Sequence, residues 1–116
     1  MVKEQTPGQK QRETIDRYFD TLPDESGNKP LDVILAKLEN HEIQTMLGEL
    51  EQEMLQTALP GLSKASQRKL LGNLSDRLTC LIISEIGQYT PDEAEQAHVA
   101  IIGLYQRLLR DGKVGK

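Results

Sequence analysis

A block of this sequence repeats itself, and the repeat constrains the fold more than any single residue does. Residues Leu38–Leu50 align without a gap with Leu62–Leu74, at an offset of 24 residues. The two copies share Gly48 with Gly72, and a partial third copy follows them. A fixed period in this range is typical of stacked helical pairs, in which each unit buries its apolar face against its neighbours. Because such stacks commonly present binding surfaces, the repeat favours a binding module.

The spacing of apolar residues predicts several short helices from Pro30 to about Gly87 and one long helix after them. The short helices are separated by turn residues such as Pro60-Gly61. Cap candidates are Asn40, Ser63 or Ser66, and Ser75. Thr90-Pro91-Asp92-Glu93 combines a Thr N-cap, a Pro at the first helical position and a capping-box Glu, and Gly112 marks the other end of the long helix. No segment has the pattern of a strand, so we expect an all-α fold.

The N-terminal part is predicted to be separate from the repeats. Residues 1–8 are expected to be a flexible tail, 9–22 an amphipathic helix, 23–30 a polar linker and 31–114 the helical domain. The helix over 9–22 carries one apolar stripe, which includes Phe19. Two arrangements are open for this stripe: it packs on the helical domain of its own chain, or it packs on another copy.

Gly48 and Gly72 fall inside predicted helices at equivalent positions. A glycine in a helix interior costs about 1 kcal/mol relative to alanine. Its presence twice in one register predicts that two helix backbones approach closely there. The alternative is that the position is exposed and tolerates glycine.

Composition excludes several classes of protein. The net charge of −4 disfavours a nucleic-acid binder, which usually carries a strong basic patch. The single cysteine, Cys80, cannot form an internal disulfide and suits a reducing compartment. No apolar run approaches the length of a membrane span, and the N-terminus lacks the apolar core of a signal peptide. We therefore expect a cytoplasmic protein without membrane insertion.

Few residues could support catalysis or metal binding. His41 and His98 are the only histidines; we expect His41 to be solvated and His98 to be a partly buried structural residue. Asp92, Glu93 and Glu95 cluster at a helix N-terminus, where carboxylates favour the helix dipole, so a structural role is expected rather than a metal site. The histidines and the cysteine lack zinc-ligand spacing. The sequence predicts no enzyme, no metal and no cofactor.

Four charged residues are candidates for protein binding. Arg68 and Lys69 belong to a small basic cluster without aromatic neighbours. Arg77 and Glu85 lie about two turns apart on a similar face of one predicted helix. A charged ridge of this kind can serve electrostatic docking, and it can equally be a face that keeps the protein soluble.

Several segments occur in an order and spacing that match a known family. They are Ile43-Gln44 followed by Met46-Leu47, Ala58-Leu59 before Gly61, Lys69–Arg77, Glu95–Ala97, and Arg107-Leu108 with Gly112–Val114. In these segments the chain resembles the C-terminal domain of the bacterial flagellar motor switch protein FliG, beginning near Lys29.

This resemblance implies an armadillo-like, right-handed superhelix at the cytoplasmic side of the motor, near the inner face of the membrane. It also implies a charged ridge that contacts the stator. The family arginine corresponds to Arg77, and an acidic family position corresponds to Glu85. Two other family charges are not kept. Pro60 stands where the family has a lysine, and the family arginine before the last helix falls near Thr90.

Three hypotheses for function follow. The favoured one is a protein–protein interaction module with a stator or rotor partner. The second is a scaffold or regulator that kept the fold outside the motor, which Pro60 and Thr90 favour. The third is a homo-oligomeric structural protein joined through the helix over 9–22.

Overall fold

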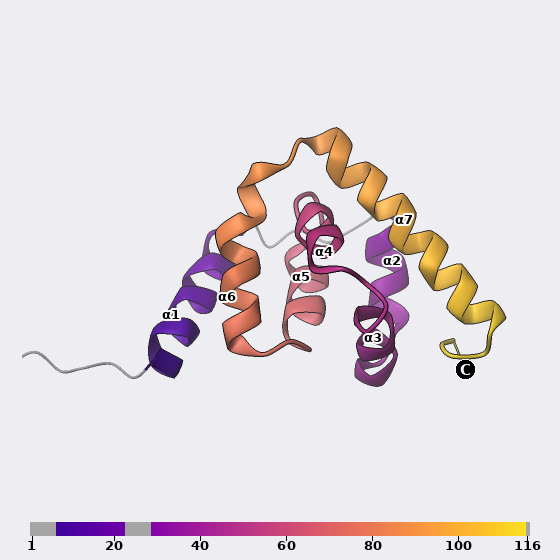
Figure 1. Cartoon of the computed structure of the whole chain (residues 1–116), viewed down its shortest axis with the longest axis horizontal. Helices are drawn as coiled ribbons and strands as arrows, with labels where there is room; N and C mark the ends of the chain where they lie inside the picture. Colours follow the sequence, from indigo (N-terminus) through magenta and orange to yellow (C-terminus); the bar gives the residue numbers. More distant parts are fainter. Residues whose placement is uncertain (1–6, 23–28, 116) are drawn as a thin grey trace, which may run out of the picture.

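The computed structural model describes residues 7–22 and 29–115, so most of the predicted tail over 1–8 and of the predicted linker over 23–30 lies outside the described residues. Every regular element in the described part is helical, which confirms the all-α prediction (Figure 1). The armadillo-like, right-handed course stays a prediction, with which the order of helices is compatible. The elements are α1 (Pro7–Asp20), α2 (Pro30–Lys37), α3 (Asn40–Leu47), α4 (Gln52–Ala58), α5 (Lys64–Leu71), α6 (Asp76–Glu85), the 3-10 turn η1 (Ile86–Gln88) and α7 (Pro91–Arg110).

The sequence repeat is a repeat of structure. Helices α3 and α5 begin and end at equivalent positions of the two copies, 24 residues apart. The Oγ of Ser63 caps α5 by accepting a hydrogen bond from the Ser66 N–H at 3.2 Å. The prediction that Asn40 caps α3 is wrong by one residue. The N-cap is Glu39, because the Glu42 carboxylate accepts its backbone N–H at 2.9 Å in a capping box.

The prediction of a close helix–helix approach at Gly48 and Gly72 is wrong. Both glycines are exposed C-cap residues in the right-handed helical region, with φ of −64° and −66°. An added Cβ at Gly48 would meet only carbonyl oxygens of its own helix, at 3.5 Å, and one at Gly72 would lie 2.6 Å from the Arg68 carbonyl oxygen. The glycines end two equivalent helices and contact no second backbone. The spacing of apolar residues continues through the turn after each helix, so the sequence pattern placed these glycines inside helices rather than at their ends.

The core is almost entirely aliphatic and continuous along the chain. Its fully buried side chains include Leu35, Ile43, Leu59, Ile82 and Leu108. Helix α7 packs along α4 and also contacts α2 and α3, whereas α6 contacts α4 and α1, at the other end of the molecule (Figure 1). The long helix therefore joins α2, α3 and α4, and α6 packs against α1 on one side.

Helix α1 packs on its own chain, which is the first of the two arrangements left open for its apolar stripe. Ile15 and Phe19 are each only 4% exposed and belong to the core. The Arg68 guanidinium lies over the Phe19 ring, 4.5 Å from its centroid. The Tyr18 hydroxyl donates a hydrogen bond to the Gln67 side chain. In this conformation the stripe is covered and does not offer an apolar face to a second copy.

Both ends of α7 follow the capping rules. At its start, Thr90 and Glu93 form the predicted capping box. At its end, the Gly112 N–H donates to the Leu109 carbonyl at 3.1 Å and the Lys113 N–H to the Leu108 carbonyl at 2.9 Å. This is a Schellman motif, and it requires the φ of +73° that Gly112 adopts. The chain then turns back and buries Val114, which is 3% exposed.

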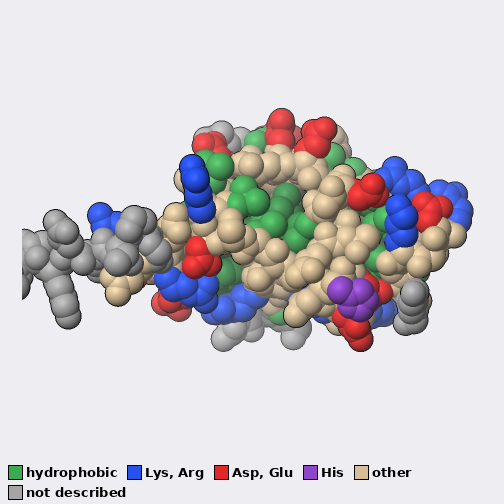
Figure 2. Space-filling view, turned by 60° about the horizontal axis from the view of Figure 1, so that its bottom comes forward, with side chains coloured by type: hydrophobic (Ala, Val, Ile, Leu, Met, Phe, Trp, Pro, Cys, Tyr) green, Lys and Arg blue, Asp and Glu red, His purple; other side chains and the backbone are tan. Residues whose placement is uncertain are grey.

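One face of the molecule is hollowed. Figure 2 shows hydrophobic side chains gathered in a depression near the centre of this face, with polar and charged side chains around it. Several hydrophobic side chains that pack on the core are only partly buried; they include Leu47, Leu50, Leu74 and Leu78. The molecule therefore exposes apolar surface as well as charge.

Candidate protein-binding surface

Helix α6 has one side that faces solvent. The Oγ of its N-cap, Ser75, accepts the Leu78 N–H at 3.2 Å, and Thr79 and Ile82 are 2% and 1% exposed in the core. The free side carries four residues that we call the α6 ridge: Arg77 and Ser84, which are exposed, Leu81, which is 50% exposed, and Glu85, which is half-buried. The ridge thus combines a cation, an anion and an apolar side chain.

Arg77 and Glu85 form no ion pair with any described residue, whereas the neighbouring Asp76 pairs with Arg12 at 3.5 Å. Both charges also lie at the unfavourable ends of their helix. Arg77 is in the first turn, at the positive end of the dipole, and Glu85 is the last residue of α6, at its negative end. Neither charge is therefore explained by the stability of α6.

The structure does not bring Arg68 and Lys69 to this ridge. Arg68 lies over Phe19 and covers the α1 contact. The Nζ of Lys69 donates to the Ala36 carbonyl at 3.4 Å, near the end of α2. Each side chain therefore has a partner within the chain, and their role in binding a second protein stays a prediction.

Sequence reasoning missed the exposure of Leu81. In the sequence, Leu78, Leu81 and Ile82 all fit one apolar stripe, but Ile82 is fully buried whereas Leu81 is 50% exposed. Spacing is a signal for this difference, because residues 78, 82 and 86 recur every four positions and face the core without residue 81. An exposed leucine next to unpaired charges adds an apolar contact to the ridge.

His98 and Cys80 have structural environments. His98 is 6% exposed and its Nε2–H donates to the Ala58 carbonyl at 2.5 Å, which joins α7 to α4 and confirms the prediction of a buried structural histidine. The Cys80 thiol donates to the Gln11 carbonyl at 3.3 Å. Burial, with a smaller effect from Asp76, raises the pKa of this thiol and keeps it protonated at neutral pH. These environments do not activate a base or a nucleophile.

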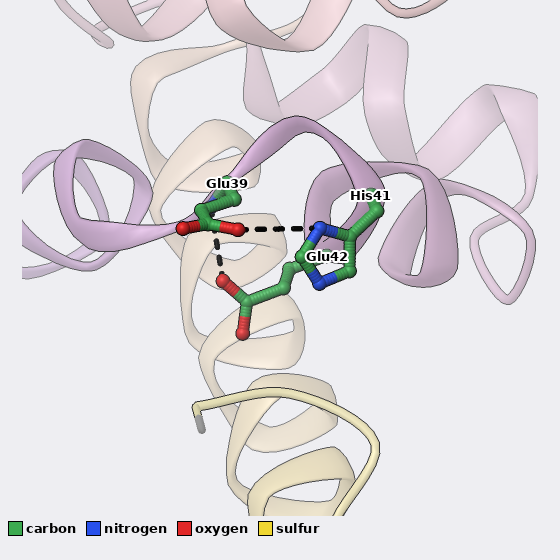
Figure 3. A group of neighbouring side chains, drawn as sticks. All are labelled: Glu39, His41 and Glu42. Atoms are coloured by element: carbon green, nitrogen blue, oxygen red, sulfur yellow. Dashed lines mark hydrogen bonds and ion pairs between the residues drawn. The ribbon is translucent and has the colours of Figure 1, made fainter.

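Glu39, His41 and Glu42 lie together at the start of α3 (Figure 3). The exposed His41 places its Nδ1 3.4 Å from the Glu39 carboxylate. Glu42 is already engaged, because one carboxylate oxygen accepts the Glu39 N–H and the other accepts the Gly115 N–H. These two hydrogen bonds hold the pKa of Glu42 below its ordinary value. The group caps a helix and holds the C-terminal residues, which is a structural role.

The fold defines a class: a small all-α domain built on a helical repeat. A family model for the FliG C-terminal domain matches residues 31–115, so the chain belongs to this family of flagellar-motor-related helical domains. The crystal structure of FliG (residues 116–343 of that protein) from H. pylori is similar, with a TM-score of 0.63 and 20% sequence identity. The likeness covers 98% of this chain and 58% of the H. pylori chain.

A search of curated protein sequences finds no match to this chain. Among the described residues, no helix is both long enough and apolar enough to cross a membrane. The family match covers the repeats and α7, whereas α1 precedes the matched residues.

Proposed function

We propose that this chain is a protein-recognition domain of the flagellar motor, that it acts in the cytoplasm, and that it binds a stator or rotor protein through the α6 ridge. Family membership supports the motor context. The observation that carries the ridge assignment is the position of Arg77 and Glu85, unpaired and at the unfavourable ends of α6. Exposed charges of opposite sign steer a partner toward one orientation, and Leu81 adds an apolar contact between them.

The test separates stability from binding. Arg77→Glu and Glu85→Lys each place the favourable charge at their end of α6, so each variant should gain about 0.3–1 kcal/mol of stability. The same variants should recover less partner when the tagged protein is purified from its own cells at native expression. Lys10→Glu is the matched control, because it reverses an exposed charge in the first half of α1.

Stability measured by urea unfolding and partner yield measured by quantitative mass spectrometry should therefore change in opposite directions. Unchanged yield in both ridge variants would contradict the ridge assignment. Loss of yield with reduced stability would show misfolding rather than a lost contact.

A second function, as a scaffold or regulator outside the motor, is favoured by Pro60 and Thr90. Pro60 is half-buried and stands where the family has a lysine. Thr90 is the N-cap of α7, and its side chain accepts a hydrogen bond from the Glu93 N–H. Recovery of proteins unrelated to the motor, lost in the same ridge variants, would establish this alternative.

A further inference from the structure

A second surface lies away from the α6 ridge, between α4 and α7. A groove of about 500 Å³ runs there, with Met54 and Ala97 among its apolar lining residues. Three carboxylates line it, from Glu51, Glu53 and Glu93. It therefore has an apolar part beside an acidic wall, and none of the described lysines or arginines lines it.

The acidic surface continues along α7. An adjoining cavity of about 410 Å³ is lined by Asp92, Glu95, Gln96 and Val99. Gln96 lines both hollows, so they are contiguous. Val99 is 69% exposed, the largest exposed fraction among the large hydrophobic side chains described. On its other side, the surface meets Lys29, which lines a separate cavity together with Asp92 and Glu95.

Helix formation explains only part of this arrangement. Glu93 is used in the capping box of α7, and Glu53 and Asp92 lie in first turns, where carboxylates favour the dipole. It does not explain Glu95, which lies beyond the first turn, nor the exposed Val99. The carboxylates of Glu51, Glu53 and Glu95 have no cationic partner among the described residues. Five carboxylates thus share one face with the partly buried Met54 and the exposed Val99.

We propose that this α4–α7 groove binds a short basic segment of another protein, in which an apolar side chain lies between lysines or arginines. The apolar side chain would cover the partly buried Met54 beside the exposed Val99, and the cations would face the carboxylates of Glu51, Glu53 and Glu95. Laying an amphipathic segment into a groove between helices is a common mode of peptide recognition. Complementary charge fixes which segment binds and in which direction. The groove is a different surface from the α6 ridge, so either assignment can fail without the other.

The first experiment uses the full chain labelled with ¹⁵N and a synthetic amphipathic peptide of lysine and leucine. We expect chemical-shift changes confined to α4 and the first half of α7, with affinity that falls as salt is added. A glutamate–leucine peptide and a lysine–serine peptide should each bind much more weakly, because they lack the charge or the apolar side chains. Changes spread over the whole surface, or centred on Arg77 and Leu81, would overturn the proposal.

Variants then test the residues. Glu51→Gln with Glu53→Gln should weaken binding of the lysine–leucine peptide by roughly tenfold. Asp20→Asn with Asp111→Asn removes the same charge at exposed positions elsewhere and should leave the affinity unchanged. Thr57→Arg, which places bulk and positive charge in the groove, should abolish binding. Equal loss in the charge-matched control would show non-specific attraction and overturn the proposal. If the protein self-associates and the two glutamine substitutions abolish this, the groove binds a second copy of the chain. That result would also overturn the proposal.

Discussion

Asp32 joins two helices that are distant in sequence, α2 and α5. It is 4% exposed on α2, and one of its carboxylate oxygens accepts hydrogen bonds from the Ser63 N–H, at 3.0 Å, and from the Ser66 hydroxyl. The other oxygen accepts the Lys29 N–H at 3.4 Å. Burial alone would raise the pKa of Asp32, but hydrogen bonds from Ser66, Ser63 and Lys29 outweigh it and hold the pKa below its ordinary value. At neutral pH the carboxylate is therefore charged, and both of its oxygens accept hydrogen bonds within the fold.

Asp32→Asn should lower the free energy of unfolding by about 1–3 kcal/mol at neutral pH, because buried donors lose a charged acceptor. A lowered folded-state pKa means that the stabilisation is present above the unfolded pKa, near 3.9, and is lost as pH falls through the folded value. The difference between wild type and variant, measured by urea unfolding, should shrink as the pH falls below the unfolded pKa of about 3.9. Asp20→Asn is the exposed control, and a difference that stays constant with pH would contradict this role.

At the scale of one element, α1 rests mainly on a single neighbouring helix. Its strong contacts are with α6, and an isolated helix of its length is marginal in water. Phe19→Ala removes its main anchor, at a cost of about 3–5 kcal/mol if the helix stayed docked. We expect α1 to detach instead. Amide hydrogen exchange should then lose protection in α1 and keep it in α7.

The control for this prediction is Val33→Ala, which shortens a hydrophobic side chain that is 45% exposed and should leave exchange unchanged. Equal loss of protection in α1 and α7 after Phe19→Ala would contradict the prediction. That result would mean that α1 belongs to the same cooperative unit as the repeats.

Sequence patterns predicted the elements well where local chemistry decides them. The capping box at Thr90, the Ser75 cap and the glycine after α7 are local signals, and all three are present in the structure. The partners of Arg68 and Lys69 could not be predicted, because they come from α1 and α2, which are distant in sequence. The same holds for Asp32. The residues Arg77 and Glu85 were predicted from their spacing on one helix and then matched to family charges, whereas their lack of an ion-pair partner among the described residues emerged only from the structure.

Across the whole molecule, the C-terminal residues join the end of the long helix to the first repeat. Val114 is buried after the Schellman turn, and the Gly115 N–H reaches the Glu42 carboxylate on α3. Val114→Ala removes two buried methyl groups and should lower the global stability by about 1–2 kcal/mol. Val99→Ala makes the same chemical change at a side chain that is 69% exposed and should alter stability little. Thermal unfolding of both variants checks this pair, and equal effects would contradict it.

The contacts of α7 with α2, α3 and α4 also limit how this architecture can change. In an open solenoid, another unit can be inserted because each unit touches only its neighbours. Here one helix of 20 residues packs across α2, α3 and α4, so a 24-residue unit inserted between these helices would separate surfaces that α7 must cover together. Diversification in such a domain is therefore expected through substitutions on its exposed faces rather than through a change in the number of repeats.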